Sequence, residues 1–158
     1  DLIPSMVIRQ VESQDFEEMA ELYSKFFPEH DKFSGDVDKI LSYLQNQSNS
    51  HACFVSKDKH KLLAVTFVVR LGENKNGSHK RWRFRHFAYK DEKAAIELLG
   101  AVEAYIKEQS NTVKIELNIA QTEKGFEFYA ANGYSKEGEL LNHFRWGEVC
   151  FVLGKSIE

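Results

Sequence analysis

The chain has 158 residues, of which 42% are hydrophobic, a size that suits one ordinary core and leaves little room for a second domain. Its formal net charge is only -3, which argues against a charged, disordered tail and against nucleic acid as the main partner. No apolar run approaches the ~20 residues of a membrane helix and no signal peptide is visible, so we predict a cytoplasmic protein without a membrane partner.

Residues 6–158 are expected to form a single domain, and residues 1–5 are interpreted as an appended remnant that precedes the natural start at Met6. The two cysteines, Cys53 and Cys150, lie far apart in apolar, strand-like runs. This spacing predicts neither a disulfide framework nor a metal site, so we expect two buried free thiols. The histidines show no paired ligand spacing, and no metal is predicted.

Alternating apolar and polar side chains predict seven strands, and apolar residues at helical spacing predict four helices. In chain order we expect a strand at 6–11, helices at 15–27 and 36–44, strands at 51–56, 62–71 and 80–89, a helix at 91–106, a strand at 113–119, a helix at 122–133, and strands at 134–141 and 148–153. The order is β-α-α-β-β-β-α-β-α-β-β. The fold class is therefore α/β (mixed α+β), with a central mixed sheet of about seven strands whose fourth and fifth members run parallel.

Local signals set several of these boundaries. Asp15 and Glu18 have the spacing of a capping box at the start of the first helix. The polar stretch 45–50 is expected to be a loop. Thr122 is expected to cap the short helix that follows the fifth strand, and Gly133 to end that helix in the left-handed conformation.

The fourth strand carries an unusual charge pattern. Strict alternation places one set of side chains on one face (Arg81, Arg83, Arg85, Phe87 and Tyr89) and another on the opposite face (Trp82, Phe84, His86 and Ala88). Arginines on a central strand need partners or water, and Glu116 on the fifth strand is a candidate partner. Two interpretations stay open: Arg83 and Arg85 bind an anionic substrate or a phosphate, or they form a solvated face.

The segment Phe126-Glu-Phe-Tyr-Ala-Ala-Asn-Gly-Tyr134 resembles the short-helix motif of the GNAT superfamily of N-acetyltransferases. The last strand, Glu148-Val-Cys-Phe-Val-Leu-Gly-Lys155, is similar to the closing strand of that family, and the element order extends the resemblance over nearly the whole chain. The resemblance implies a GNAT-like fold and an acyltransferase that moves an acetyl group from acetyl-CoA to an amine. It also implies that the fourth and fifth strands splay apart around the pantetheine arm.

The resemblance further implies roles for particular residues. Tyr129 matches the tyrosine that protonates the leaving thiolate. The cofactor would be held by the backbone of the fourth strand and by the start of the helix that follows it, through Phe87, Ala88, Tyr89, Lys90, Lys93, Ala94 and Ala95. A general base must also take a proton from the amine, and the candidates are Glu116, His86 and His143.

The segment that should bind the cofactor phosphates has no glycine and carries Asp91 and Glu92, which place negative charge where the pyrophosphate would lie. Two functions therefore stay open. The chain is an N-acetyltransferase acting on an amine of a small molecule or peptide, or it is a catalytically silent GNAT-like module that binds a ligand or a protein. The sequence is compatible with a monomer or a homodimer.

Overall fold

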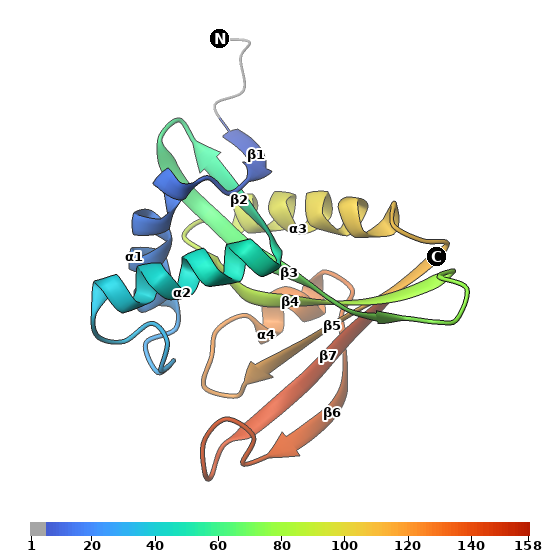
Figure 1. Cartoon of the computed structure of the whole chain (residues 1–158). Coiled ribbons are helices and arrows are strands. Elements are labelled where there is room, and N and C mark those ends of the chain that lie inside the picture. Colours follow the sequence, from blue (N-terminus) through green and yellow to red (C-terminus); the bar gives the residue numbers. More distant parts are fainter. Residues whose placement is uncertain (1–5) are drawn as a thin grey trace. The chain divides into compact units, whose positions relative to one another are not determined.

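The structure is a computed structural model that describes residues 6–158 (Figure 1). The interpretation of residues 1–5 as an appended remnant lies outside the described residues. The described chain divides into two compact units: the first contains residues 6–69 together with Arg85–Ala104, and the second contains Arg70–Phe84 together with Tyr105–Glu158. That residues 6–158 act as one domain stays a prediction.

Within residues 6–158 the structure has seven strands and four α-helices in the expected order. They are β1 (Met6–Gln10), a 3-10 turn η1 (Ser13–Asp15), α1 (Phe16–Phe26), α2 (Val37–Ser50), β2 (Ala52–Asp58), β3 (Lys61–Glu73), β4 (His79–Tyr89), α3 (Glu92–Lys107), β5 (Thr112–Ala120), α4 (Phe126–Ala131), β6 (Ser135–Leu141) and β7 (Val149–Ile157). The strand order in the sheet is β1-β2-β3-β4-β5-β7-β6. The predicted fold class and the predicted order of elements are confirmed.

The first unit is built on antiparallel strands. β1 pairs with β2, and β2 pairs with β3. Helices α1 and α2 lie in front of the β2–β3 hairpin in Figure 1, with α3 behind it. The apolar stripes of α1 and α2 bury themselves against the hairpin, as their helical spacing predicts. The largest fully buried side chains of this core are Met19, Tyr23, Phe33, Leu44, Leu62, Val55, Val65 and Phe67.

The second unit contains the parallel pair. The start of β4 runs parallel to β5, from His79 opposite Thr112 to Arg83 opposite Glu116. Both strands continue beyond this ladder, β4 to Tyr89 and β5 to Ala120. On its other side β5 pairs antiparallel with β7, which pairs antiparallel with β6. The predicted parallel fourth and fifth strands are therefore confirmed.

Two helix boundaries differ from the prediction. α2 continues through the stretch 45–50, where Gln45 Nε2 donates to Asn49 Oδ1 at 3.0 Å, one helical turn away. Polar residues on the solvent side of a helix lack an apolar period, which is why this turn was predicted as a loop. α4 begins at Phe126 behind Gly125, and the Thr122 hydroxyl donates to Glu148 Oε2 at 2.7 Å instead of capping the helix.

The predicted capping box of Asp15 with Glu18 is also wrong. Asp15 closes the turn η1 one step earlier, by accepting from the Glu12 backbone N–H at 2.8 Å. Glu18 instead accepts from the Leu62 backbone N–H at 2.9 Å, a residue of β3. The spacing of residues within a helix cannot show that Glu18 finds its partner on a strand 44 residues further along the chain.

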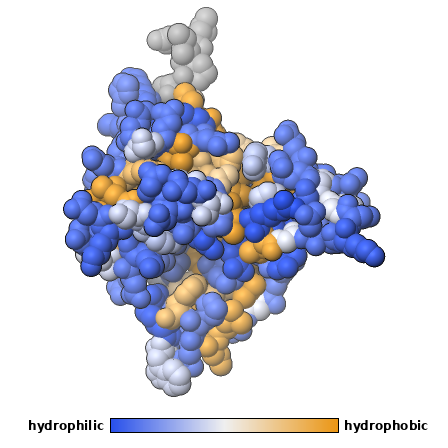
Figure 2. Space-filling view, in the orientation of Figure 1, coloured by the Kyte–Doolittle hydropathy of each residue, from blue (hydrophilic) through white to orange (hydrophobic). Residues whose placement is uncertain are grey.

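None of the helices described between residues 6 and 158 is long and apolar enough to cross a membrane. Figure 2 shows hydrophilic surface over most of the visible face, with orange apolar atoms over the β6–β7 hairpin at the bottom. The exposed apolar side chains of this hairpin are Leu140, Leu141, Phe144 and Trp146.

Candidate active site

The end of β4 in the first unit departs from regular strand geometry. His86 has a φ of 57°, in the left-handed region that non-glycine residues rarely adopt. The side chains of Arg85 and His86 consequently both reach α2: Arg85 Nη1 donates to Gln47 Oε1 at 2.8 Å, and His86 Nε2 lies 2.6 Å from the Tyr43 hydroxyl. The predicted alternation along 80–89 is therefore wrong from Arg85 onward.

The His86 imidazole is enclosed by rings. It packs against the aromatic side chains of α1, α2, the loop between them and β3, namely Tyr23, Phe27, Phe33, Tyr43 and Phe67, and its ring centroid lies 5.1 Å from that of His30. Burial, together with the neighbouring charges of His30 and Arg85, lowers the pKa of His86 to about 3. His86 is thus neutral at pH 7 and shares a hydrogen bond with Tyr43. Its role as general base stays a prediction.

The arginines of β4 have different surroundings. Arg81 Nε donates to Glu116 Oε2 at 2.7 Å, so the partnership expected for Glu116 is present. Arg83 Nε is buried and has no hydrogen-bond partner in the part of the chain that the structure describes. Arg85 Nη1 lies 3.4 Å from His51 Nε2 in addition to its bond to α2. Glu116 as a base, and Arg83 and Arg85 as substrate ligands, remain predictions.

Tyr129 lies in α4 of the second unit and is only 5% exposed. Its ring packs edge-on against Phe128 and Tyr134, with centroids 5.3 and 5.5 Å away. Gly125, at φ 117°, allows the turn that starts α4: its carbonyl accepts from the Tyr129 N–H at 3.0 Å, and a Cβ there would lie 3.4 Å from the tyrosine ring. Gly133 ends the segment at φ 93°, as predicted. The fold thus holds Tyr129 in one orientation.

The start of α3 is the expected phosphate site. Asp91 Oδ1 accepts from the Lys93 N–H at 3.3 Å, and the Asp91 carbonyl accepts from the Ala95 N–H at 3.0 Å, so Asp91 itself satisfies two amides of the first turn. The side chains of Lys90 and Lys93 are exposed. An arriving phosphate would meet these two ammonium groups and the positive end of the helix dipole.

The other residues expected to hold the cofactor are mostly buried. Phe87, Ala88, Ala94 and Ala95 are at most 5% exposed, and the half-buried Tyr89 ring lies 5.0 Å from that of Phe26. The Lys90 N–H donates to the Leu63 carbonyl of β3 at 2.8 Å. The four buried side chains therefore serve the core of the first unit, which leaves the backbone groups of this stretch to bind a pantetheine arm.

Sequence reasoning missed a polar cluster in the second unit. Glu148 Oε2 accepts from the Thr122 hydroxyl and, at 3.1 Å, from Arg145 Nη2, while Glu148 Oε1 is buried without a partner among the described residues. Burial raises the pKa of the nearby Glu123 to about 7. No local motif signals this cluster, because its members come from two separate connections. In residues 6–158 no three His, Cys, Asp or Glu side chains gather as a metal site would require.

No protein-family model matches the chain, and no curated protein sequence matches it. Solved structures match over almost its full length. A probable acetyltransferase from Staphylococcus epidermidis is 19% identical with a TM-score of 0.72, over 97% of this chain and 99% of that one. An aminoglycoside 6'-N-acetyltransferase from Enterococcus faecium is 14% identical with a TM-score of 0.72, over 96% and 97%.

A third solved structure, a putative acetyltransferase from Salmonella typhimurium with its cofactor acetyl-CoA, is 10% identical with a TM-score of 0.69, over 98% of this chain and 95% of that one. The chain has the GNAT fold. The resemblance drawn from residues 126–134 and from the element order is thus confirmed at the level of the fold. In this GNAT fold Tyr129 lies on α4, and Phe87–Tyr89 form the end of β4.

Proposed function

We propose that the chain is an N-acetyltransferase that moves an acetyl group from acetyl-CoA to an amine of a small molecule or peptide. The observation that carries this proposal is the likeness of almost the whole chain to solved acetyltransferases, one of them an aminoglycoside 6'-N-acetyltransferase and another solved with acetyl-CoA. The buried Tyr129 on α4 supports it, since the motif that suggested the function forms a helix of the fold with this tyrosine packed inside.

The chemistry is a direct transfer. The lone pair of a neutral amine attacks the thioester carbon, the N–C bond forms, the C–S bond breaks and the thiolate leaves with the electron pair. Tyr129 supplies the proton to the sulfur, provided that its hydroxyl comes within hydrogen-bond reach. A base takes the proton that the amine nitrogen loses. Glu116 is already paired with Arg81, and burial makes His86 a weak base, so neither is poised for this step in the free protein.

The phosphates of CoA would bind at the start of α3. Asp91 caps this helix and carries a negative charge, so the compensating cations must be Lys90 and Lys93, both exposed at the same turn. Exposed charges are screened over about 10 Å at 0.1 M salt, and affinity should fall as salt rises. The site therefore fits an anion that is held mainly by charge rather than by a glycine-rich loop.

Calorimetric titration with CoA and acetyl-CoA tests the proposal. We expect both to bind and to raise the melting temperature, because a ligand of the native state stabilises it. Replacing Lys90 and Lys93 by alanine should weaken CoA more than a dephosphorylated pantetheine analogue, whereas a control pair, Lys39→Ala with Lys75→Ala, should change neither. Release of free thiol from acetyl-CoA in the presence of amines then tests for transfer.

The runner-up is a catalytically silent module. The glycine-free turn favours it, because the Asp91 side chain occupies the Lys93 amide, which would otherwise face the phosphate. If the unchanged protein shows no CoA binding at low salt and millimolar ligand, the acetyltransferase proposal is wrong and the binding module takes its place.

A further inference from the structure

Two glutamates of the second unit meet at the end of a strand pair. β5 and β7 are antiparallel, with Ala120 opposite Cys150. Beyond this pair the Gln121 N–H donates to the Val149 carbonyl at 2.9 Å, and Gln121 Oε1 accepts from the Val149 N–H at 2.6 Å. Glu123 follows on one connection and Glu148 precedes β7 on the other. The pairing of the two strands therefore brings the two connections that carry Glu123 and Glu148 next to each other.

Glu148 is only half satisfied. Its Oε2 accepts from the Thr122 hydroxyl at 2.7 Å and from Arg145 Nε and Nη2 at 3.2 and 3.1 Å. Its Oε1 is buried and meets no donor in the described part of the chain, and the residue as a whole is only 9% exposed, so that little water reaches it. A buried carboxylate oxygen without a donor is costly, and native structures seldom leave one. The oxygen is suited to receive a hydrogen bond from a ligand.

The cluster carries more negative than positive charge around Glu123. Burial raises the pKa of Glu123, the charge of Arg145 and the Ala120 backbone lower it, and the charge of Glu148 raises it. Burial also raises the pKa of the Cys150 thiol. The charges of Glu123 and Glu148 act in the same direction, and the charge of Arg83 lowers this pKa. The cation that lowers the pKa of Glu123 is Arg145, and its guanidinium is already bound to Glu148 Oε2. The surroundings of Glu123 and Glu148 therefore favour the binding of a further cation.

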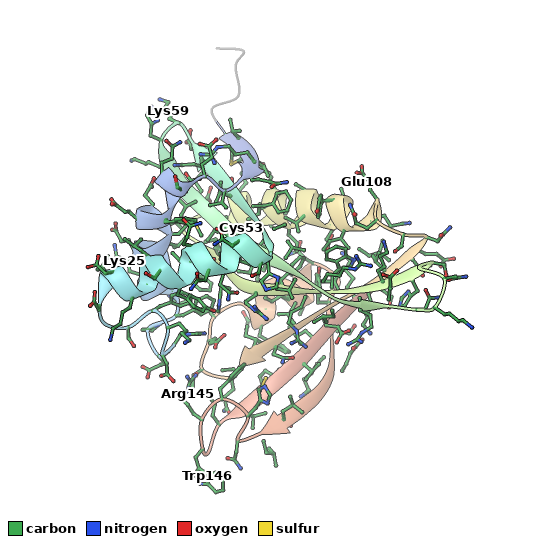
Figure 3. All side chains as sticks on the ribbon, viewed as in Figure 1. Lys25, Cys53, Lys59, Glu108, Arg145 and Trp146 are labelled. Carbon is green, nitrogen blue, oxygen red and sulfur yellow. The ribbon has the colours of Figure 1, made fainter. Side chains whose placement is uncertain are left out.

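Arg145 belongs to the turn between β6 and β7. Figure 3 shows Arg145 and its neighbour Trp146 pointing in different directions, with Trp146 at the outer end of the turn. Trp146 is 91% exposed, whereas the Arg145 guanidinium is directed to Glu148. The polar site is therefore separate from the apolar tip of the hairpin.

We propose that Glu123 and Glu148 bind the ammonium group of a primary amine, which becomes the acceptor in the acetyl transfer proposed above once a base has taken one of its protons. An ammonium is a compact cation with three N–H donors, so it can serve the unpartnered Glu148 Oε1 and the Glu123 carboxylate together. The inference rests on the proposed function only for the role of the amine as acceptor. The binding site itself stands on the two carboxylates.

Titration calorimetry on the full chain without CoA tests this inference. We expect n-butylamine and 1,4-diaminobutane to bind with millimolar affinity or tighter, and 1-butanol, which has the same carbon chain and no charge, to show no binding. Glu148→Gln and Glu123→Gln should each weaken amine binding at least tenfold. The matched control is Glu127→Gln, an exposed glutamate of α4.

Proton release gives an independent measurement. A bound cation favours the ionised form of Glu123, so amine binding at pH 7 should release protons, seen as a dependence of the binding heat on the ionisation enthalpy of the buffer. Glu123→Gln should abolish this release. The Glu123→Gln variant also keeps the test decisive if Glu148→Gln, which removes the negative charge paired with Arg145, fails to fold.

Four results would overturn the inference or part of it. Equal binding of butylamine and butanol, or unchanged amine affinity in Glu123→Gln, means that the two glutamates are not an ammonium site. CoA binding without any amine binding leaves the acetyltransferase proposal intact and removes this inference. Amine binding by a chain that binds no CoA keeps the ammonium site and removes its role as the acceptor site.

Discussion

Asp15 is a fully buried carboxylate whose partners satisfy both of its oxygens. Arg9 donates to Oδ2 at 2.8 Å and to Oδ1 at 3.1 Å, Lys57 donates to Oδ1 at 3.0 Å, and the Glu12 N–H donates to Oδ2. Burial by itself raises the pKa of Asp15, but these hydrogen bonds outweigh it and hold the pKa at about 2. The ionised form therefore stabilises the fold.

Asp15→Asn should lower the free energy of unfolding at pH 7 by about 3 kcal/mol, because it removes the common anion of the half-buried Arg9 and the buried Lys57. Because the native pKa lies below the unfolded value of 3.8, about 2 kcal/mol of stability is present above pH 4 and is lost as the pH falls toward 2. Urea unfolding at several pH values measures both effects. The exposed pair of Glu21 with Lys25 is the control: Glu21→Gln should change stability by less than about 0.5 kcal/mol.

Tyr129 is the residue on which the proposed chemistry depends most directly. Tyr129→Phe removes one hydroxyl from a packed ring, so the fold and CoA affinity should be unchanged. If Tyr129 protonates the thiolate, turnover with a measured acceptor should fall roughly 10²–10⁴-fold. Steady-state kinetics measure the turnover, and a separate titration measures the affinity for CoA. An unchanged rate would leave Tyr129 as a packing residue of α4.

At the scale of elements, β4 contains a local irregularity that reorganises its neighbours. The positive φ of His86 turns its ring into the aromatic core formed with α1 and α2, where burial is the main cause of its low pKa. In the unfolded chain this histidine takes up a proton near pH 6.5, while in the native protein it does not until about pH 3. Stability is therefore lost as the pH falls below 6.5.

His86→Asn should flatten this dependence on pH. Asparagine tolerates positive φ, so the backbone of β4 is retained although ring packing is lost and the variant is less stable overall. Between pH 7 and pH 5 the wild type should lose about 2 kcal/mol more than the variant, from the 1.5-unit interval below the unfolded pKa. His60→Asn, at an exposed position, should keep the wild-type slope. If the free energy of unfolding changed with pH in the same way for the wild type and for His86→Asn, His86 would not be the source of the pH dependence.

α3 offers a second prediction at this scale. Asp91 caps its first turn through the Lys93 N–H, and its charge opposes an arriving phosphate. Asp91→Asn keeps a side chain that can cap and removes the charge, so CoA affinity should rise while helix stability changes little. Titration at two salt concentrations checks the cause, because the gain should shrink as salt screens the charge. A gain that is independent of salt would point to a change in shape rather than charge.

At the scale of the whole molecule, two strands belong to both compact units. β3 passes from the first unit to the second after Val69, and β4 passes back after Phe84. Each of these strands is one continuous ladder of backbone hydrogen bonds, so the loss of the ladder in one unit weakens it in the other. The unfolding of the two units is therefore coupled. We therefore expect the chain to unfold in one cooperative step, in agreement with the prediction of a single domain over 6–158.

Two probes can test this cooperativity. Trp146 is 91% exposed and Trp82 is 7% exposed, so a change in tryptophan fluorescence reports mainly on Trp82 in the second unit. Amide hydrogen exchange in α1 reports on the first unit. Coincident midpoints in urea are the expected result for a two-state transition. Separate midpoints would show that the two units are independent domains.

The sequence by itself determined the elements and their order. The apolar stripes of the helices and the alternation of the strands follow from burying one face of each element, and that constraint acts on neighbouring residues. The motif at 126–134 likewise pointed to the GNAT fold, because its glycine and aromatic residues act within one short segment. Residues such as Tyr129 and Gly133 could therefore be placed correctly before the fold was known.

Only the tertiary structure decided which distant groups meet. The partners of Asp15 come from β1 and β2, the left-handed backbone of His86 directs it to Tyr43 on α2, and Glu123 approaches Glu148 because β5 and β7 are antiparallel neighbours. The polar turn at 45–50 became helical for a similar reason, since its residues lie on the solvent side of α2. Such contacts join segments that are far apart in the chain, and local periodicity carries no information about them.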